Sequence, residues 1–342
     1  MFCVLKSERN LTLSDLAKLA GVSTSTASRA LNNNPVIKLA TRERIQALAK
    51  EHNFSINAAA SRLRTQRTNV VAVILNLIEH TEQSINDPFL LKVVGDLNQA
   101  LNDKGYELLL SNSFMAKDDW YNYFINSRRA DGIIVVGQAK SEQKAIDAAK
   151  AGAPLVVWGD SNTQSNYPII GSNNRLGGKL AAQHLIENGH TRLVFLGDTG
   201  HAEMNERYQG YLDAHKAAGL TADPTLVFPI DLTSQAAYNA VNETILKRGL
   251  HFDGIVSCSD MVALGALKAL KERYISIPGE VAIVGFDDIA MAELLHPALT
   301  TIRQNTRDAA NKMVEQLLNQ LNGEPAFSDV IDIELVVRKS SV

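Results

Sequence analysis

The sequence predicts a small all-α helix-turn-helix head, followed by an α/β body of two lobes, each with a doubly wound parallel sheet. Three observations predict this architecture. From about residue 70 onward, short apolar runs alternate with amphipathic stretches. Near the N-terminus, two short helical patterns are separated by a turn that contains glycine. The first 69 residues carry a net charge of +7, whereas the remaining residues carry −10.

The length and composition limit the class of protein. A chain of 342 residues is too long for one ordinary core and indicates two or three domains. The longest apolar run, Val70–Leu75, is too short to cross a bilayer. The apolar stretch Phe2–Leu5 is too short for the core of a signal peptide. We therefore expect a soluble, cytoplasmic protein without a membrane partner.

The head is expected to contain three short helices. Thr12 can cap the first, with Asp15 as its capping-box partner. Gly21 lies in the break before the second helix, which Ser23 can cap, and Thr41 can cap the third. The expected inward-facing residues are apolar: Leu13, Leu16, Ala17, Ala20, Ala27, Ala30, Leu31, Ile45, Leu48 and Ala49.

A helix-turn-helix places its second helix in the major groove of DNA. Here the outward residues of that helix are predicted to be Thr24, Ser25, Ser28 and Arg29. Hydroxyls and a guanidinium suit base edges and phosphates. The alternative is a three-helix packing domain with a solvated Ser/Thr face. The basic charge of the head favours a polyanionic partner.

The body is expected to bind a ligand in the crevice beyond the carboxyl ends of its strands. The expected strands are Val70–Leu75, Tyr106–Ser111, Gly132–Gly137, Pro154–Gly159, Arg192–Gly197, Leu226–Ile230, Gly254–Ser259 and Val281–Phe286. The expected helices are Phe89–Lys104, Leu176–Asn188, Arg207–Ala218 and Met261–Arg273.

Motifs of the common enzyme classes are missing from the sequence. Gly177-Gly178-Lys179 has the wrong spacing for a phosphate loop, and Leu180 replaces the Ser or Thr that would bind magnesium. No dinucleotide fingerprint follows a strand, and no nucleophile elbow occurs. The histidines lack metal-ligand spacing, and the two cysteines lie far apart. We expect a binding protein, with no catalytic residue, metal or cofactor.

Many ordered motifs resemble the LacI/GalR family of bacterial transcription regulators. The similarity runs from about Leu11 to Val342. Its motifs include Leu13–Ala17, Ala20–Ser23, Ala27–Asn32, Thr41–Ile45, Asn57–Arg64, Asp87–Phe89, Ala130–Ile134, Arg207–Tyr211, Asp260–Ala266, Val284–Asp288 and Leu299–Gln304.

The resemblance implies a division of the chain into four parts. The helix-turn-helix domain would span residues 11–56, and a hinge helix with its linker residues 57–69. The N-terminal lobe would comprise residues 70–168 and 296–323, and the C-terminal lobe residues 169–295 and 324–342. The body would be like a periplasmic sugar-binding protein. The protein would bind pseudo-palindromic double-stranded operator DNA as a homodimer. A tetramer is not expected, because the sequence shows no C-terminal leucine heptad.

The resemblance also assigns DNA contacts. Thr24, Ser25 and Arg29 would read bases. Ser28 and Asn32 would contact phosphates. Leu63 would enter the minor groove at the operator centre beside its twofold mate, where an apolar wedge can kink the duplex. The alternative role for Leu63 is packing between lobes.

Five residues are expected to bind the effector. Arg207 matches the family's effector arginine, whose donors suit vicinal sugar hydroxyls. Asp287 and Asp160 match acids of the cleft, and Phe89 is placed to stack on a sugar face. Ser259 stands where the family usually has Asn. For Arg207 and Asp287 the alternative is an ion pair between lobes without a ligand. For Trp158 and Trp120 we expect core burial rather than stacking on a ligand.

The expected mechanism is repression of carbohydrate-utilisation genes, relieved when a sugar bound between the lobes separates the hinge helices. Cleft acids and one arginine suit a neutral polyol, such as a glucoside, sucrose or a maltose-like sugar. The alternative is a regulator that needs a purine or another metabolite as co-repressor.

Overall fold

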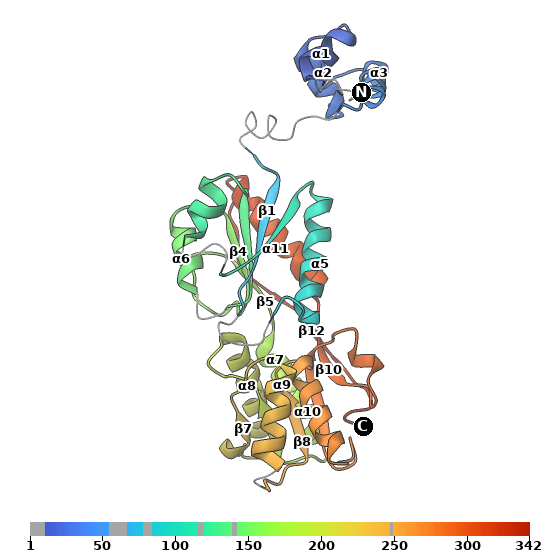
Figure 1. Cartoon of the computed structure of the whole chain (residues 1–342). Coiled ribbons are helices and arrows are strands. Elements are labelled where there is room, and N and C mark those ends of the chain that lie inside the picture. Colours follow the sequence, from blue (N-terminus) through green and yellow to red (C-terminus); the bar gives the residue numbers. More distant parts are fainter. Residues whose placement is uncertain (1–10, 55–66, 78–83, 115–118, 139–141, 247–248) are drawn as a thin grey trace, which may run out of the picture. The chain divides into compact units, whose positions relative to one another are not determined.

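The computed structural model describes residues 11–54, 67–77, 84–114, 119–138, 142–246 and 249–342. It separates into two compact units, residues 1–67 and 68–342 (Figure 1). The first unit contains the helical head and the second the α/β body. Each is described by itself.

The head contains the three expected helices, α1 (Leu13–Leu19), α2 (Thr24–Leu31) and α3 (Leu39–Glu51). The Thr12 hydroxyl accepts a hydrogen bond from the Asp15 backbone N–H, and the Asp15 carboxylate accepts one from Thr12 in return. Ser23 caps α2 by accepting from the Thr26 N–H at 3.1 Å. The Thr41 cap is wrong, because α3 already begins at Leu39 and has no side-chain cap.

The core of the head is small. Its buried residues are Leu16, Ala20, Ala30, Ile45 and Ala49. All three helices contribute to it, so α2 is fixed against the other two and presents its opposite face to solvent.

The first sheet of the body has the strand order β11-β5-β4-β3-β1-β2, and every pair in it is parallel. Its strands are β1 (Val70–Leu75), β2 (Glu107–Asn112), β3 (Gly132–Val136), β4 (Leu155–Trp158), β5 (Ile169–Ser172) and β11 (Asp329–Ile331). The side chains of β1, β3, β4 and β5 are buried along their whole length, as expected for strands covered on both faces.

The second sheet has the order β12-β10-β9-β8-β6-β7, and only β12 runs antiparallel to its neighbour. Its strands are β6 (Leu193–Leu196), β7 (Val227–Phe228), β8 (Gly254–Ser257), β9 (Ala282–Asp287), β10 (Thr300–Gln304) and β12 (Ile333–Val336). Each sheet reverses its strand order next to its first strand, which is where open α/β sheets bind ligands.

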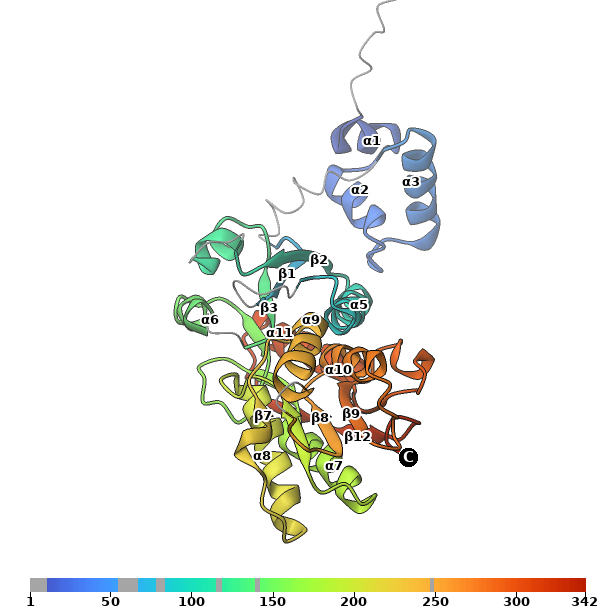
Figure 2. The ribbon, with the colours of Figure 1, turned by 60° about the horizontal axis from the view of Figure 1, so that its bottom comes forward.

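Helices cover both faces of each sheet (Figures 1 and 2). In the first lobe α5 (Pro88–Asp103) and α11 (Thr306–Leu321) share one core, and α6 (Glu142–Lys150) packs on the other side with the π-helical turn Tyr121–Asn126. In the second lobe α7 (Asn174–Glu187) pairs with α8 (Ala202–Ala217), and α9 (Ser234–Asn239) pairs with α10 (Asp260–Glu272). Shorter turns are Pro224–Leu226, Ala240–Leu246 and Ala292–Leu294.

The predicted lobe boundaries are wrong at three places, because strand pairing decides which lobe a segment joins. Ile169–Ser172 pairs with β4 and so belongs to the first lobe, not the second. Thr300–Gln304 pairs with β9 and belongs to the second lobe. Asp329–Ile331 pairs with β5 and belongs to the first. The chain therefore crosses between the lobes after β5, after β10 and after β11.

The helices that the structure describes are all too short or too polar to span a membrane.

Candidate functional site

Helix α2 presents a polar surface to solvent. Thr24, Ser25 and Arg29 are exposed on it, as the sequence predicts. The Ser25 hydroxyl lies 2.8 Å from that of Ser23, which also caps the helix. These side chains leave a short, accessible surface of hydroxyls and one guanidinium, a set that can donate to phosphates and to base edges.

Two of the predicted phosphate contacts lie differently. Ser28 is buried, with 5% of its surface exposed, because it lies beside Ala27 on the face that packs into the head. The prediction that Ser28 points outward is therefore wrong, and its phosphate contact stays a prediction. Asn32 is exposed, but its side-chain amide donates to the Ser28 carbonyl at 3.0 Å. Leu63, the predicted wedge, lies outside the described residues.

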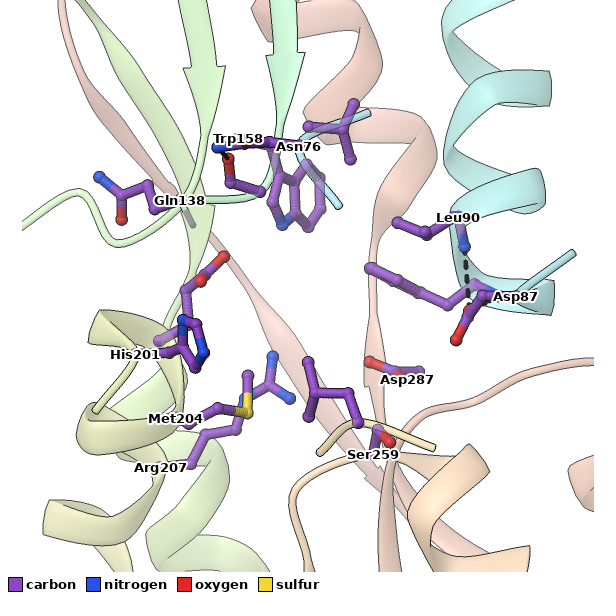
Figure 3. A pocket seen from close by; sticks show the side chains of 15 residues that line it. Asn76, Asp87, Leu90, Gln138, Trp158, His201, Met204, Arg207, Ser259 and Asp287 are labelled. Carbon is purple, nitrogen blue, oxygen red and sulfur yellow. Dashed lines mark hydrogen bonds between the residues drawn. The ribbon is translucent and has the colours of Figure 1, made fainter. Parts of the chain in front are cut away.

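A cavity of about 740 Å³, counted with its open mouth, lies between the two lobes of the body (Figure 3). Most lining residues follow the carboxyl ends of strands or begin helices. The residues that line it are Asn76, Asp87, Phe89, Leu90, Val136, Gly137, Gln138, Trp158, His201, Glu203, Met204, Arg207, Leu232, Ser259 and Asp287.

Arg207 reaches the cavity from α8 and is held rigidly in place. Its Nε donates to Asn174 Oδ1 at 2.8 Å, and its Nη1 donates to the Cys258 carbonyl. The guanidinium carbon lies 3.5 Å from the centre of the Phe286 ring, a cation–π contact. Burial lowers the pKa of Arg207, and Asp287 opposes that effect. The Nη2 group makes no hydrogen bond to a residue that the structure describes, so it can donate to a ligand.

Asp287 ends β9 on the cavity wall. Its φ of 117° is a conformation that costs a residue other than glycine about 1–3 kcal/mol, and such strain clusters at ligand sites. Gln304 Nε2 donates to Asp287 Oδ1 at 2.7 Å. Burial raises the pKa of Asp287 well above its ordinary value, and Arg207 works in the opposite direction. A ligand hydroxyl that donates to this carboxyl would stabilise its charged form.

Phe89 and Ser259 also line the cavity, as predicted. The Phe89 ring meets Trp158 edge to face, with centroids 6.0 Å apart. The Ser259 oxygen caps α10 by accepting from the Val262 N–H at 3.2 Å, which leaves its own O–H free to donate.

Asp160, the fifth predicted effector residue, does not line the cavity. Its Oδ1 accepts from the Asn162 backbone and side chain at 3.1 and 3.0 Å, so the carboxylate holds its own loop together. Trp158, expected in the core, is only 5% exposed, yet it faces the cavity. Trp120 is fully buried, as expected.

The sequence analysis missed several polar residues of the pocket. Asp87 accepts from the backbone N–H groups of Phe89 and Leu90 at the start of α5, and burial raises its pKa. Gln138 and Asn76 follow the ends of β3 and β1. Glu203 lies one helical turn before Arg207 on α8, and that spacing of four was the available signal.

The chemistry of this pocket is binding. Among the residues that the structure describes, no group of three His, Cys, Asp or Glu side chains could hold a metal ion. The lining combines aromatic faces with separated donors and acceptors, an arrangement typical of sites that bind and orient a small molecule.

Comparisons with known proteins agree with both units. A model of the lacI family of bacterial regulatory proteins matches residues 12–57, and one of a periplasmic binding protein-like domain matches residues 182–341. The HTH-type transcriptional regulator CelR of Thermobifida fusca is 30% identical over 98% of this chain and 100% of its own. The HTH-type transcriptional repressor PurR of Haemophilus influenzae is 29% identical over 96% of this chain and 98% of its own.

Solved structures have the same fold. A CelR–cellobiose complex matches with a TM-score of 0.72 and 29% identity, over 96% of this chain and 99% of that one. A lac repressor dimer bound to operator and the anti-inducer ONPF matches with a TM-score of 0.82 and 22% identity. The match covers 98% of this chain and 100% of that chain. The chain therefore belongs to the lacI family of bacterial regulatory proteins and is a DNA-binding transcription regulator, not an enzyme.

Proposed function

We propose that the chain is a repressor of carbohydrate-utilisation genes that binds a pseudo-palindromic operator as a homodimer and is released by a sugar inducer. The observation that carries the proposal is the cavity between the lobes. Arg207 and Asp287 enter it from one lobe and Phe89 and Trp158 from the other. A ligand that contacts both lobes stabilises one arrangement of the lobes over another. Binding in the body can alter DNA binding in this way.

A neutral sugar suits the polar groups of the cavity. The side chains of Ser259 and Asp287 offer a donor and an acceptor, and Arg207 keeps a free Nη2 group. The rings of Phe89 and Trp158 supply apolar faces for the C–H side of a sugar. The cellobiose complex of CelR supports a sugar, whereas the likeness to PurR supports a purine co-repressor as the second candidate.

The first test is fluorescence anisotropy of the full chain on labelled DNA from upstream of its own gene, at two salt concentrations. Cellobiose, maltose, sucrose, glucose, guanine and hypoxanthine are then added singly. We expect tight, salt-sensitive binding that one sugar releases. Binding that a purine strengthens would instead establish the co-repressor mechanism. Failure of every compound to change binding to a selected operator would contradict effector control.

On the DNA side, we propose that Thr24, Ser25 and Arg29 read bases. Asn32, the exposed C-cap residue of α2, is proposed as a phosphate contact, and Leu63 is proposed as the minor-groove wedge.

Arg29→Ala is expected to weaken operator binding about 10- to 100-fold, since a good arginine–base pair is worth about 1–3 kcal/mol. Binding to scrambled DNA should change much less. The matched control is Lys50→Ala, which removes one exposed positive charge from α3 instead of α2. An equal loss on operator and scrambled DNA would make Arg29 a phosphate contact and not a base contact.

A further inference from the structure

The polar groups of the cavity differ in how completely they are already bonded. Asp87 and Asp287 accept hydrogen bonds from neighbouring groups of the protein, and Arg207 donates to the Asn174 side chain and to the Cys258 carbonyl. Two groups stand apart. The Nε2 of Gln138 is buried and has no hydrogen-bond partner among the residues that the structure describes. Within the described part of the chain, the Glu203 carboxylate bonds to no other side chain and accepts a hydrogen bond only from its own backbone N–H.

Gln138 and Glu203 reach the cavity from different lobes. Gln138 follows β3, and its Oε1 accepts from the Asp160 N–H at 2.6 Å, which fixes the amide plane. Its Nε2 is therefore a positioned donor without an acceptor. Glu203 lies in the first turn of α8 and offers two acceptor oxygens. In Figure 3, Gln138 and His201 lie on one side of the cavity and Asp87 and Asp287 on the other.

The charges around the cavity are unbalanced. Among the described residues, its lining contains the carboxyl groups of Asp87, Glu203 and Asp287, the guanidinium of Arg207, and no lysine. The charge of Arg207 is partly offset by Asp287. Asp160, in the loop after β4, adds a further negative charge that acts on Glu203. An anionic ligand would therefore bring a like charge into a partly desolvated space.

We propose that Glu203 is the residue that determines effector specificity, by accepting hydrogen bonds from an uncharged hydroxyl-bearing effector and excluding phosphorylated or carboxylated ones. Gln138 donates to the same part of the effector from the opposite lobe. The inference rests on the proposed function, because it assumes that this cavity binds the effector.

The ionisation of Glu203 gives a second signature. Burial raises the pKa of Glu203 to about 7. The positive charge of Arg207 lowers this pKa, and the negative charge of Asp160 raises it. Hydroxyl groups that donate to the carboxylate favour its charged form and lower that pKa in the complex. Effector affinity should then rise with pH. A decrease of one unit in pKa corresponds to an increase of about fivefold between pH 6 and pH 8.

The test is calorimetric titration of the full chain at pH 6, 7 and 8 with matched neutral and anionic probes. These are cellobiose and cellobionate, glucose and glucose 6-phosphate, and hypoxanthine and inosine 5′-monophosphate. For the neutral probe that binds, we expect the anionic partner to bind at least about tenfold more weakly, a difference near 1.4 kcal/mol. In Glu203→Gln this preference should fall to about threefold or less. The pH dependence should become much weaker, and what remains is the contribution of Asp287, whose pKa burial also raises.

The matched control is Glu206→Gln. Glu206 lies on the same helix and burial also raises its pKa, but it does not line the cavity. The Glu206→Gln protein should keep both the preference for the neutral probe and the pH dependence. That result would also exclude a general effect of charge on α8. A Glu203→Gln protein that keeps both, or a wild-type protein that prefers an anionic probe, would overturn the inference and leave the proposed function intact. Failure of every probe to bind would overturn the proposed function and the inference with it.

Discussion

Arg207→Ala is expected to abolish the response to the effector and to leave operator binding intact. The guanidinium has one nitrogen available for a ligand, and its other groups are fixed by Asn174 and Cys258. A hydrogen bond to a charged group contributes about 1.5–3 kcal/mol, so effector affinity should fall about 10- to 150-fold. Operator binding depends on the separate helical unit and should stay near the wild-type value.

The measurement is a pair of titrations on the same preparation, with the effector by calorimetry and with the operator by anisotropy. Arg175→Ala is the control, because Arg175 is an exposed arginine on α7 that pairs with Asp213 at 2.7 Å. Removing Arg207 also leaves Asp287 without its nearest positive charge in a buried site, so thermal unfolding is recorded. A folded Arg207→Ala protein that still releases operator with the effector would contradict the proposed role.

Several strands buried on both faces are predicted well, although the equally buried β5 (Ile169–Ser172) is not among the expected strands. Val70–Leu75 and Gly132–Val136 are continuous apolar runs, and both are strands of the first sheet. β10 was missed because Thr300 and Thr301 look like loop residues. In the structure the Thr301 hydroxyl donates to Asp260 at 2.6 Å, and Thr300 bonds to Ser340 and Arg338. Buried threonines with side-chain partners do not produce a hydrophobic pattern.

The same limit explains the errors in the site. Asp160 and Glu203 are both acids near the crevice. The sequence does not show which of the two carboxylates is already hydrogen-bonded within its own turn. Asp160 accepts from Asn162 two residues away, a local bond, whereas Glu203 is left facing the cavity. The outward orientation predicted for Ser28 is wrong for a related reason, because the buried face of α2 includes this polar residue together with Ala27 and Ala30.

The second large effect is expected from Gly178→Ala, in the glycine pair that the sequence presented as a poor phosphate loop. Gly178 lies on α7 where that helix crosses α8, and a Cβ there would overlap the Arg207 carbonyl group. Gly210 of α8 makes the reciprocal approach to Arg175 on α7. The glycines therefore allow close packing of two helix backbones, and no side-chain rotation can relieve the overlap.

Gly178→Ala should therefore cost about 3 kcal/mol and lower the melting temperature of the body by about 6–12 °C. Effector affinity should fall with it, since Arg207 is displaced from Asn174 on the same pair of helices. The matched control is Gly95→Ala in α5, where a Cβ meets nothing within 4 Å. That change should stabilise the protein by about 0.5–1 kcal/mol, because alanine is the better helix former. Melting temperatures of Gly178→Ala and wild type within a degree of each other would show that the two helices can move apart, and that their close contact is not what positions Arg207.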